Sequence, residues 1–257
     1  MSPIQTRAHG ALTELRLARP PANALDPALC AALTQALRAA VDQGAEGIVL
    51  SGGPKVFSGG LDVPHLLALG EDRAALRSAW ETFFAAAAAL AECPVPVAAA
   101  IDGHAPAGGC VLALCCDYRV MARAPDPAKP YRIGLNEVQV GLVAPEGVQH
   151  LLRRVVGAYR AERLLVAGAM PDTDQALAIG LVDEAVPEGD AVARAAAWLD
   201  TLRALPRQAM LQTRAIARED LVAALRPERI RLAHFLDAWY AKDTQAALRA
   251  LVARLGK

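Results

Sequence analysis

The 257-residue chain lacks an excess of charge of either sign. Lysine and arginine together number 27, as do aspartate and glutamate, so the formal net charge is zero. A protein that binds nucleic acid needs a surplus of cationic side chains to neutralise phosphates, and that surplus is missing. The balance argues against nucleic acid as a partner, although a few local basic residues could still hold one phosphate.

The chain also has little that would place it in a membrane or outside the cell. Its longest apolar-looking run, residues 82–90, is mostly alanine and lies between Glu81 and Glu92, so no segment is expected to span a membrane. The N-terminus has no basic segment followed by an apolar one. The five cysteines are an odd number, which favours reduced thiols, with Cys115 and Cys116 as small core residues. We therefore expect a cytoplasmic protein.

Several motifs of well-known enzyme sites are missing. The sequence has no GxGxxG dinucleotide fingerprint, no Walker-type loop, no Ser/His/Asp arrangement and no acids paired at metal-ligand spacing. The cysteines show no metal-ligand spacing with histidine. We therefore expect neither a metal nor a redox cofactor.

The order of hydrophobic patterns indicates an α/β core followed by a helical region. Short apolar segments predict strands, and longer periodic segments predict helices. The predicted strands cover residues 11–17, 47–51, 97–101 and 118–122, and the predicted helices cover residues 27–41, 73–91, 110–114, 146–156 and 160–166. After about residue 189 the pattern is helical throughout. We expect a core over residues 1–188 and a helical oligomerisation region over residues 189–257.

Two glycine-rich turns each follow a predicted strand. They read VFSGGLD at residues 56–62 and GHAPAGGC at residues 103–110. At the second turn a helix begins, so free N–H groups and the positive end of a helix dipole point into one space. Two such turns could each donate an N–H to one carbonyl oxygen and so form an oxyanion hole. For the first turn alone, an ordinary structural turn remains the alternative.

A single carboxylate stands in the segment YRIGLNEVQVGLVAP, residues 131–145. This is Glu137, and its neighbours in sequence are apolar or carry amides. An acid in an apolar pocket near N–H donors is suited to removing a proton next to a thioester carbonyl. Burial would raise the pKa of such a base, with Ile133, Leu135 and Val111 as the expected apolar wall.

These segments, with RPPANALD, CCDYR and GLVDEAVP in the same order, resemble the crotonase (enoyl-CoA hydratase/isomerase) superfamily over nearly the whole chain. Within it they look most like the mitochondrial-type Δ3,Δ2-enoyl-CoA isomerases. The resemblance implies an α/β fold, a spiral of ββα turns with a C-terminal helical region. It also implies an acyl-CoA substrate from fatty acid β-oxidation, no separate cofactor, and a homotrimer or a dimer of trimers.

The resemblance also implies roles for individual residues. The oxyanion N–H groups would be those of Leu61 and Gly108, and Glu137 would be the catalytic base. The residues expected to line the path of coenzyme A or of the acyl group are Ala22, Ala24, Gly59, Gly60, Asp62, Val63 and Val111.

Val111 is the main departure from the hydratases of the superfamily. They carry a second glutamate at this position, which helps to orient the attacking water, and valine can neither hydrogen-bond water nor transfer a proton. The sequence therefore favours an isomerase. Glu146 and Gly147, where the isomerase pattern has bulky aromatics, leave open a second acid and a changed acyl space. Two alternatives remain: a hydratase or other crotonase with altered acyl specificity, and an inactive acyl-CoA-binding protein.

Two further groups of residues are noted without a catalytic role. His65 and His104 lie near the two turns and are expected to be polar wall or surface residues. The helical tail carries four of the eleven aromatic side chains of a chain that is only 4% aromatic, together with the large apolar Leu202. These residues either anchor a subunit interface or pack inside the same chain. They are Trp198, Leu202, Phe235, Trp239 and Tyr240.

Overall fold

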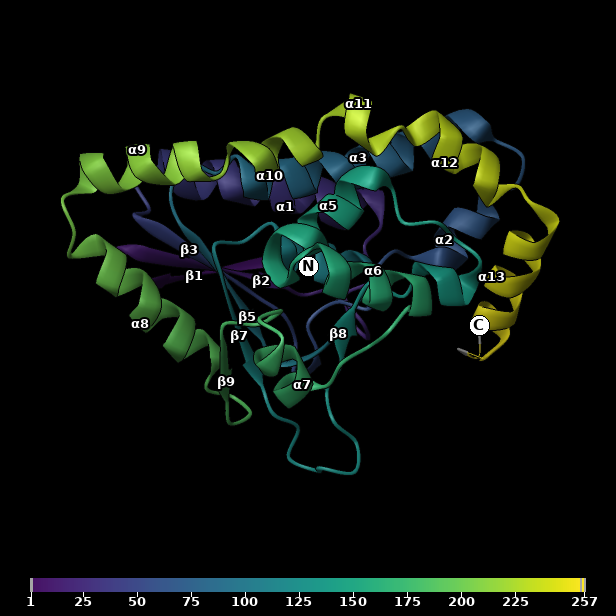
Figure 1. Cartoon of the computed structure of the whole chain (residues 1–257). Coiled ribbons are helices and arrows are strands. Elements are labelled where there is room, and N and C mark those ends of the chain that lie inside the picture. The colour runs from purple at the N-terminus through teal and green to yellow at the C-terminus, as the bar shows by residue number, and fades with distance from the viewer. Residues whose placement is uncertain (1, 255, 257) are drawn as a thin grey trace.

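A computed structural model describes residues 2–254 and 256 (Figure 1). Its main sheet has six strands in the order β1-β2-β3-β5-β7-β9. All neighbours in this sheet are parallel except the antiparallel pair β1 and β2. The strands are β1 (Ile4–His9), β2 (Leu12–Leu17), β3 (Gly47–Ser51), β5 (Val97–Ile101), β7 (Tyr118–Ala122) and β9 (Glu184–Val186). Every residue of β3 and β5 is buried, as expected for central parallel strands with both faces covered.

A second, smaller parallel sheet has the order β4-β6-β8. Its strands are β4 (Lys55–Val56), β6 (Gly103–Pro106) and β8 (Ile133–Gly134). In chain order, β4 follows β3, β6 follows β5, and β8 follows β7. From β3 to β8, each turn of the chain thus gives one strand to each sheet before the next helical segment, which is the ββα spiral that the sequence resemblance implied.

The helices of the first part of the chain agree closely with the sequence predictions. Asp26 caps α1 by accepting a hydrogen bond from the Leu29 N–H at 2.8 Å, and Pro27 occupies the first turn. The proline-rich segment of residues 123–130 forms a loop that extends away from the body between β7 and β8 (Figure 1). The helices are α1 (Pro27–Asp42), α2 (Val63–Ala68), α3 (Arg73–Ala91), α4 (Gly108–Leu114), the 3₁₀ helix η1 (Glu137–Val140), α5 (Glu146–Val156), α6 (Ala158–Ala167) and α7 (Thr173–Ala178).

The rest of the chain is helical, and no strand follows β9 within the described residues. The first helix of this region, α8, packs on β3, β5 and β7, whereas α12 packs on α3, and α13 contacts α2 and η1. In Figure 1 the helices from α9 to α12 cross above α1 and α3, and α13 turns down beside α2. These helices are α8 (Ala191–Arg203), α9 (Arg207–Ala217), α10 (Glu219–Ala224), α11 (Pro227–Ile230), α12 (Leu232–Trp239) and α13 (Lys242–Arg254). The division of the chain at residue 188 stays a prediction.

The aromatic residues of the helical tail pack inside their own chain. Trp239 is buried, and the ring of Phe235 lies 4.4 Å from that of Trp80 on α3. Trp198 stacks on Tyr118 with ring centroids 4.5 Å apart. Of the two sequence-based alternatives for these three tail residues, packing within the chain therefore holds. The expected trimer has no support from them and stays a prediction.

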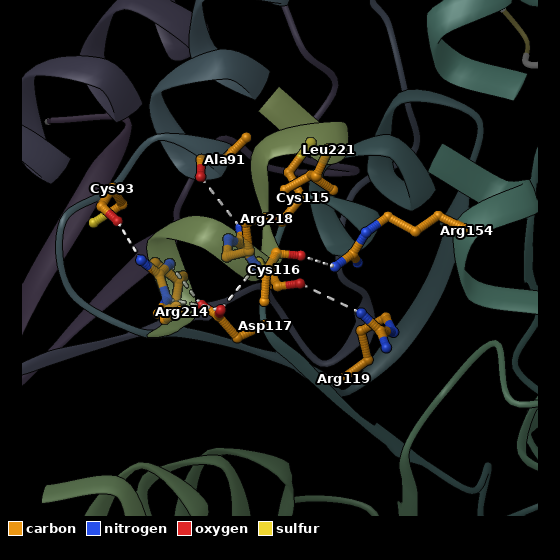
Figure 2. Close-up of polar contacts among 12 residues, drawn as sticks. Ala91, Cys93, Cys115, Cys116, Asp117, Arg119, Arg154, Arg214, Arg218 and Leu221 are labelled. Carbon is orange, nitrogen blue, oxygen red and sulfur yellow. Dashed lines mark hydrogen bonds and ion pairs between the residues drawn. The ribbon is translucent and has the colours of Figure 1, made fainter. Parts of the chain in front are cut away.

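A buried cluster of charges joins the helical tail to the core (Figure 2). Asp117, which follows α4, accepts hydrogen bonds from Arg214 on α9 and from Arg218 at the start of α10, all at 2.8 Å. Arg214 also donates to the Cys93 carbonyl, and Arg218 to the Cys115 carbonyl at the end of α4. The two arginines of the tail donate hydrogen bonds to one carboxylate and to several backbone carbonyls of the core. This cluster therefore fixes the tail against the ends of α3 and α4. All five cysteines are buried free thiols.

Asp117→Asn should lower the free energy of unfolding by about 3–5 kcal/mol, because it leaves two buried guanidinium groups facing a neutral amide. The change is measured by urea unfolding. Asp174→Asn is the matched control, since Asp174 pairs with Arg123 on the surface, where such pairs contribute about 1 kcal/mol or less. Equal effects of the two substitutions would show that the buried cluster does not anchor the tail.

Candidate active site

The carboxyl ends of β4, β6 and β8 lie side by side at one edge of the smaller sheet. Val56 is paired with His104, and Pro106 is paired with Gly134. The strands are parallel, so the segments that follow them leave the sheet at the same edge. Through this register the first glycine-rich turn, the start of α4 and Glu137 come together, although the sequence separates them by up to 80 residues.

The two glycine-rich turns are in direct contact. A Cβ atom added at Gly108 would lie 3.5 Å from the Gly60 Cα, and one added at Gly109 would lie 2.6 Å from the Ser58 carbonyl oxygen. A side chain at Gly109 would therefore push the turns apart, which explains why glycine stands there. The N–H groups of Leu61 and Gly108 donate to no acceptor within the described part of the chain.

The turn before α4 has an unusual backbone conformation. Ala107 has φ 45° and ψ −116°, a region that L-residues rarely adopt, and such a residue costs about 1–3 kcal/mol. The Ala107 N–H donates to the Gly134 carbonyl at 2.8 Å, which holds the turn against β8. The strained residue is thus the last one before the helix whose first N–H belongs to Gly108.

A cavity of about 490 Å³ opens at this edge, and its walls are mainly apolar. They come from the two turns, η1, α3, α5, α12 and α13. The lining residues are Pro21, Ala22, Ala24, Val56, Gly59, Leu61, Asp62, Val63, Pro64, Trp80, Phe83, Phe84, His104, Pro106, Ala107, Gly108, Val111, Asn136, Glu137, Val140, Leu142, Pro145, Val148, Phe235 and Leu251.

Glu137 is the first residue of η1 and lines this cavity. Its Oε2 atom is buried and has no hydrogen-bond partner within the described residues. Burial among apolar side chains disfavours the charged form and raises the pKa of Glu137 to about 7. A carboxyl group with this pKa can both accept and return a proton at neutral pH.

The other titratable side chains that line the cavity are engaged elsewhere. Although burial opposes it, hydrogen bonds from the His65 N–H and from Arg19 lower the pKa of Asp62. His104 accepts a hydrogen bond at Nδ1 from the Arg132 N–H, and burial together with the nearby Arg132 charge lowers the pKa of His104. Asp62 is therefore an ion-paired helix cap, and His104 is a neutral wall residue.

The structure brings together nearly all of the residues that the sequence assigned to the site. Val111 is 2% exposed and lines the cavity, so no second acid stands at this position. Gly60 differs from the prediction, because it packs against the Pro106 carbonyl with φ +83° and does not line the cavity. His65 does not line it either. The predicted residues that do are Ala22, Ala24, Gly59, Leu61, Asp62, Val63, Gly108, Val111 and Glu137.

Glu146 and Gly147 do not change the cavity in the way that the sequence left open. The Glu146 carboxylate is exposed and pairs with Arg229 at 2.6 Å, and neither residue lines the cavity. A Cβ atom at Gly147 would lie 1.9 Å from the Ala224 carbonyl oxygen. Glycine therefore stands at position 147 because α10 passes close to α5, and Glu146 is a surface acid at the start of α5.

Several wall residues were not found from the sequence. Trp80, Phe83 and Phe84 lie at i, i+3 and i+4 on α3, a spacing that indicated only a core-facing helix. Phe235 and Leu251 come from the helical tail. No motif near them in the sequence links them to Glu137, which lies more than 90 residues earlier.

The profile of the family described as "Enoyl-CoA hydratase/isomerase" matches residues 7–248. The chain belongs to this family. It is accordingly a crotonase-fold enzyme, and the sequence-based identification of the superfamily is confirmed. The chain is 31% identical over 255 residues to the human mitochondrial enoyl-CoA delta isomerase 1, which covers 98% of this chain and 82% of that protein.

Further relatives include isomerases and hydratases. The crystal structure of human mitochondrial Δ3-Δ2-enoyl-CoA isomerase superposes with a TM-score of 0.91 at 29% identity, covering 99% of this chain and 98% of that one. A probable enoyl-CoA hydratase of Mycobacterium avium is 35% identical over 210 residues, which is 79% of this chain and 77% of that protein. These relatives thus include both activities, and the likeness to them does not choose between the two.

Within the described residues, no group of three or more His, Cys, Asp or Glu side chains could hold a metal ion. No helix within residues 2–254 is long and apolar enough to cross a membrane.

Glu137→Gln should stabilise the folded protein at pH 8 but not at pH 4. The folded state keeps the Glu137 proton up to about pH 7, whereas the unfolded chain releases it near pH 4.5, so wild-type stability falls as the pH rises between these values. Glutamine removes this loss, which amounts to at most about 3 kcal/mol. Urea unfolding of both proteins at pH 4 and pH 8 measures the difference. A constant difference would show that the pKa is not raised.

Proposed function

We propose that the protein is a Δ3,Δ2-enoyl-CoA isomerase that converts 3-enoyl-CoA into 2-trans-enoyl-CoA. One observation carries this proposal. The cavity holds a single carboxylate with a pKa near neutrality, and a buried valine stands where the second acid of a hydratase would be. The likeness to human mitochondrial enoyl-CoA delta isomerase 1 supports it.

In this proposal the two free N–H groups bind the thioester oxygen. The N–H groups of Leu61 and Gly108 point at negative charge that develops on this oxygen, and the N-terminus of α4 adds its dipole. Each such donor lowers the barrier of comparable reactions by about 3–4 kcal/mol. The C2 proton of the acyl group becomes acidic as a result.

Glu137 then moves one proton. Its carboxylate takes the proton from C2, which gives a dienolate, and returns it at C4, which places the double bond between C2 and C3. One base serves both steps, and the raised pKa of Glu137 matches this double use. No water enters the reaction, and coenzyme A is part of the substrate, so no separate cofactor takes part.

The remaining parts of the cavity fit this assignment. We assign the wall formed by Ala22, Ala24, Gly59, Asp62 and Val63 to coenzyme A, and the wall beyond Val111 to the acyl chain. The enzyme would act in fatty acid β-oxidation in the cytoplasm, as a trimer or a dimer of trimers. Light scattering at micromolar concentration tests the oligomer.

Glu137→Gln should lower turnover of 3-hexenoyl-CoA by about 10²–10⁴-fold, because the base is lost while the shape of the site is kept. For the wild type, kcat/KM should rise with pH and level off above about pH 7, since Glu137 must be deprotonated. Glu146→Gln is the control, because this exposed acid pairs with Arg229 outside the cavity and should leave activity near the wild-type value. The reverse result would make Glu146 the base.

Wild-type protein should isomerise 3-hexenoyl-CoA much faster than it hydrates 2-hexenoyl-CoA, because Val111 cannot hold a water opposite Glu137. Absorbance of the conjugated thioester follows both reactions: it appears in the first and disappears in the second. Val111→Glu should add some hydration at a cost in stability, since it buries a second carboxylate next to the first. Equal wild-type rates would favour the hydratase alternative, and binding without reaction would favour a binding protein.

A further inference from the structure

The segment 19–25, which connects β2 to α1, lies against the first glycine-rich turn. Main-chain hydrogen bonds join the two, such as the one from the Gly59 N–H to the Ala22 carbonyl at 2.7 Å. Leu25 and Leu61 also form an isolated parallel β-bridge. The turn that carries one of the proposed oxyanion N–H groups is therefore held by a segment from an earlier part of the chain, outside both sheets.

One of these hydrogen bonds fixes the direction of the Leu61 N–H. This N–H belongs to the same peptide group as the Gly60 carbonyl, and in a planar trans peptide the C=O and the N–H point in opposite directions. The Gly60 carbonyl accepts a hydrogen bond from the Leu25 N–H at 2.8 Å. The following N–H, that of Asp62, donates to the Leu25 carbonyl at 3.2 Å. Because Leu25 holds this peptide group by its oxygen, the Leu61 N–H is directed away from the segment 19–25.

The buried side chain of Asn23 holds the segment in this register. Asn23 is 5% exposed and has φ 47°, a left-handed conformation that asparagine adopts more readily than most residues. Its Oδ1 atom accepts a hydrogen bond from the Arg19 N–H at 2.8 Å, and its Nδ2 atom donates to the Phe57 carbonyl at 3.0 Å. One amide group thus shapes its own segment and ties that segment to the start of the turn.

Ser58 completes the network from the side of the turn. Its hydroxyl is buried, donates to the Asn23 carbonyl at 2.8 Å and accepts a hydrogen bond from the Gly60 N–H at 3.3 Å. The hydroxyl therefore joins the segment 19–25 to the glycine whose carbonyl belongs to the oxyanion peptide group. Neither Asn23 nor Ser58 lines the cavity, so any effect on the reaction has to pass through the Gly60–Leu61 peptide group.

We propose that Asn23 and Ser58 are positioning residues of the isomerase, whose hydrogen bonds hold the Gly60–Leu61 peptide group so that its N–H faces the thioester oxygen. Direction matters here, because an N–H···O interaction weakens steeply when its angle falls below about 120°. If the peptide group can rotate, the developing negative charge loses a donor while most contacts of the substrate remain. This inference rests on the isomerase function proposed above and adds to it the residues that set the oxyanion geometry.

The first test separates turnover from binding. Ser58→Ala removes the hydroxyl with little change in shape, and kcat for 3-hexenoyl-CoA should fall about ten- to hundredfold, as for a small displacement of a catalytic group. The Kd of octanoyl-CoA, which cannot isomerise, should stay near the wild-type value. Thr173→Val is the matched control, because the buried Thr173 hydroxyl also donates to a main-chain carbonyl, that of Ala122 at 2.9 Å, but Thr173 lies outside the cavity wall. It should lose similar stability and keep the wild-type kcat.

The second test observes the thioester carbonyl itself by infrared spectroscopy. Octanoyl-CoA with an isotope label at the carbonyl carbon should show a band at lower wavenumber when bound to the wild type, because N–H donors polarise the C=O bond. The shift should be smaller in Ser58→Ala. It should also be smaller in Asn23→Gly, since glycine keeps the left-handed backbone accessible and removes only the side chain. Thr173→Val should keep the full shift.

The outcomes distinguish this inference from the function on which it rests. A wild-type band at the position of the free ligand, or a wild type that does not isomerise 3-hexenoyl-CoA, would contradict the isomerase function itself. A shifted wild-type band that neither Ser58→Ala nor Asn23→Gly changes would overturn the positioning role alone. Equal losses of kcat in Ser58→Ala and Thr173→Val would overturn it as well, because they would show a general effect of lost stability.

Discussion

The close contact between two backbone turns at the carboxyl edge of the smaller sheet governs the geometry of this protein. A Cβ atom at Gly109 would lie 2.6 Å from the Ser58 carbonyl oxygen, and one at Gly103 would lie 2.0 Å from the Lys55 carbonyl carbon. Only backbone fits between these segments. Because the turns touch, Leu61 and Gly108, from distant parts of the sequence, line one cavity, and no side chain is needed to bring them there.

The carboxylate in the cavity differs from the buried carboxylates elsewhere in the fold, because it lacks a partner among the described residues. Glu14 is a buried glutamate, but it accepts a 2.6 Å hydrogen bond from the Ser51 hydroxyl and another from His9, and these outweigh burial and lower the pKa of Glu14. Asp117 is held by two arginines. Glu137 has no such partner, and burial alone raises its pKa. A carboxylate kept unpaired at a cost to stability is typical of a catalytic base.

Much of this arrangement could be predicted from the sequence, and the exceptions have physical causes. Apolar runs and helical patterns of five or more residues predicted β3, β5, β7 and α3 at their observed bounds, because such lengths give a readable signal. Strands β4 and β8 have two residues each and leave no periodic signal. Glu137 and Val111 were found because they lie in specific motifs. The crowding of Gly147 by Ala224 depends on the packing of α10 on α5, which no local pattern contains.

The helical tail gives the cavity a wall that is separate in sequence from the two turns and Glu137. Phe235 and Leu251 line the cavity from α12 and α13, whereas both glycine-rich turns and Glu137 belong to the spiral. Arg214 and Arg218 tie the tail to Asp117, so substitutions in α12 can change the wall while the anchor stays in place. Such a division allows relatives that share the motifs around Glu137 to differ in the acyl chain that they accept. For this chain, the contact between Phe235 and Trp80 is one point at which the tail meets the spiral in the cavity wall. Acyl specificity should therefore depend more on α3 and α12 than on the motif that carries the base.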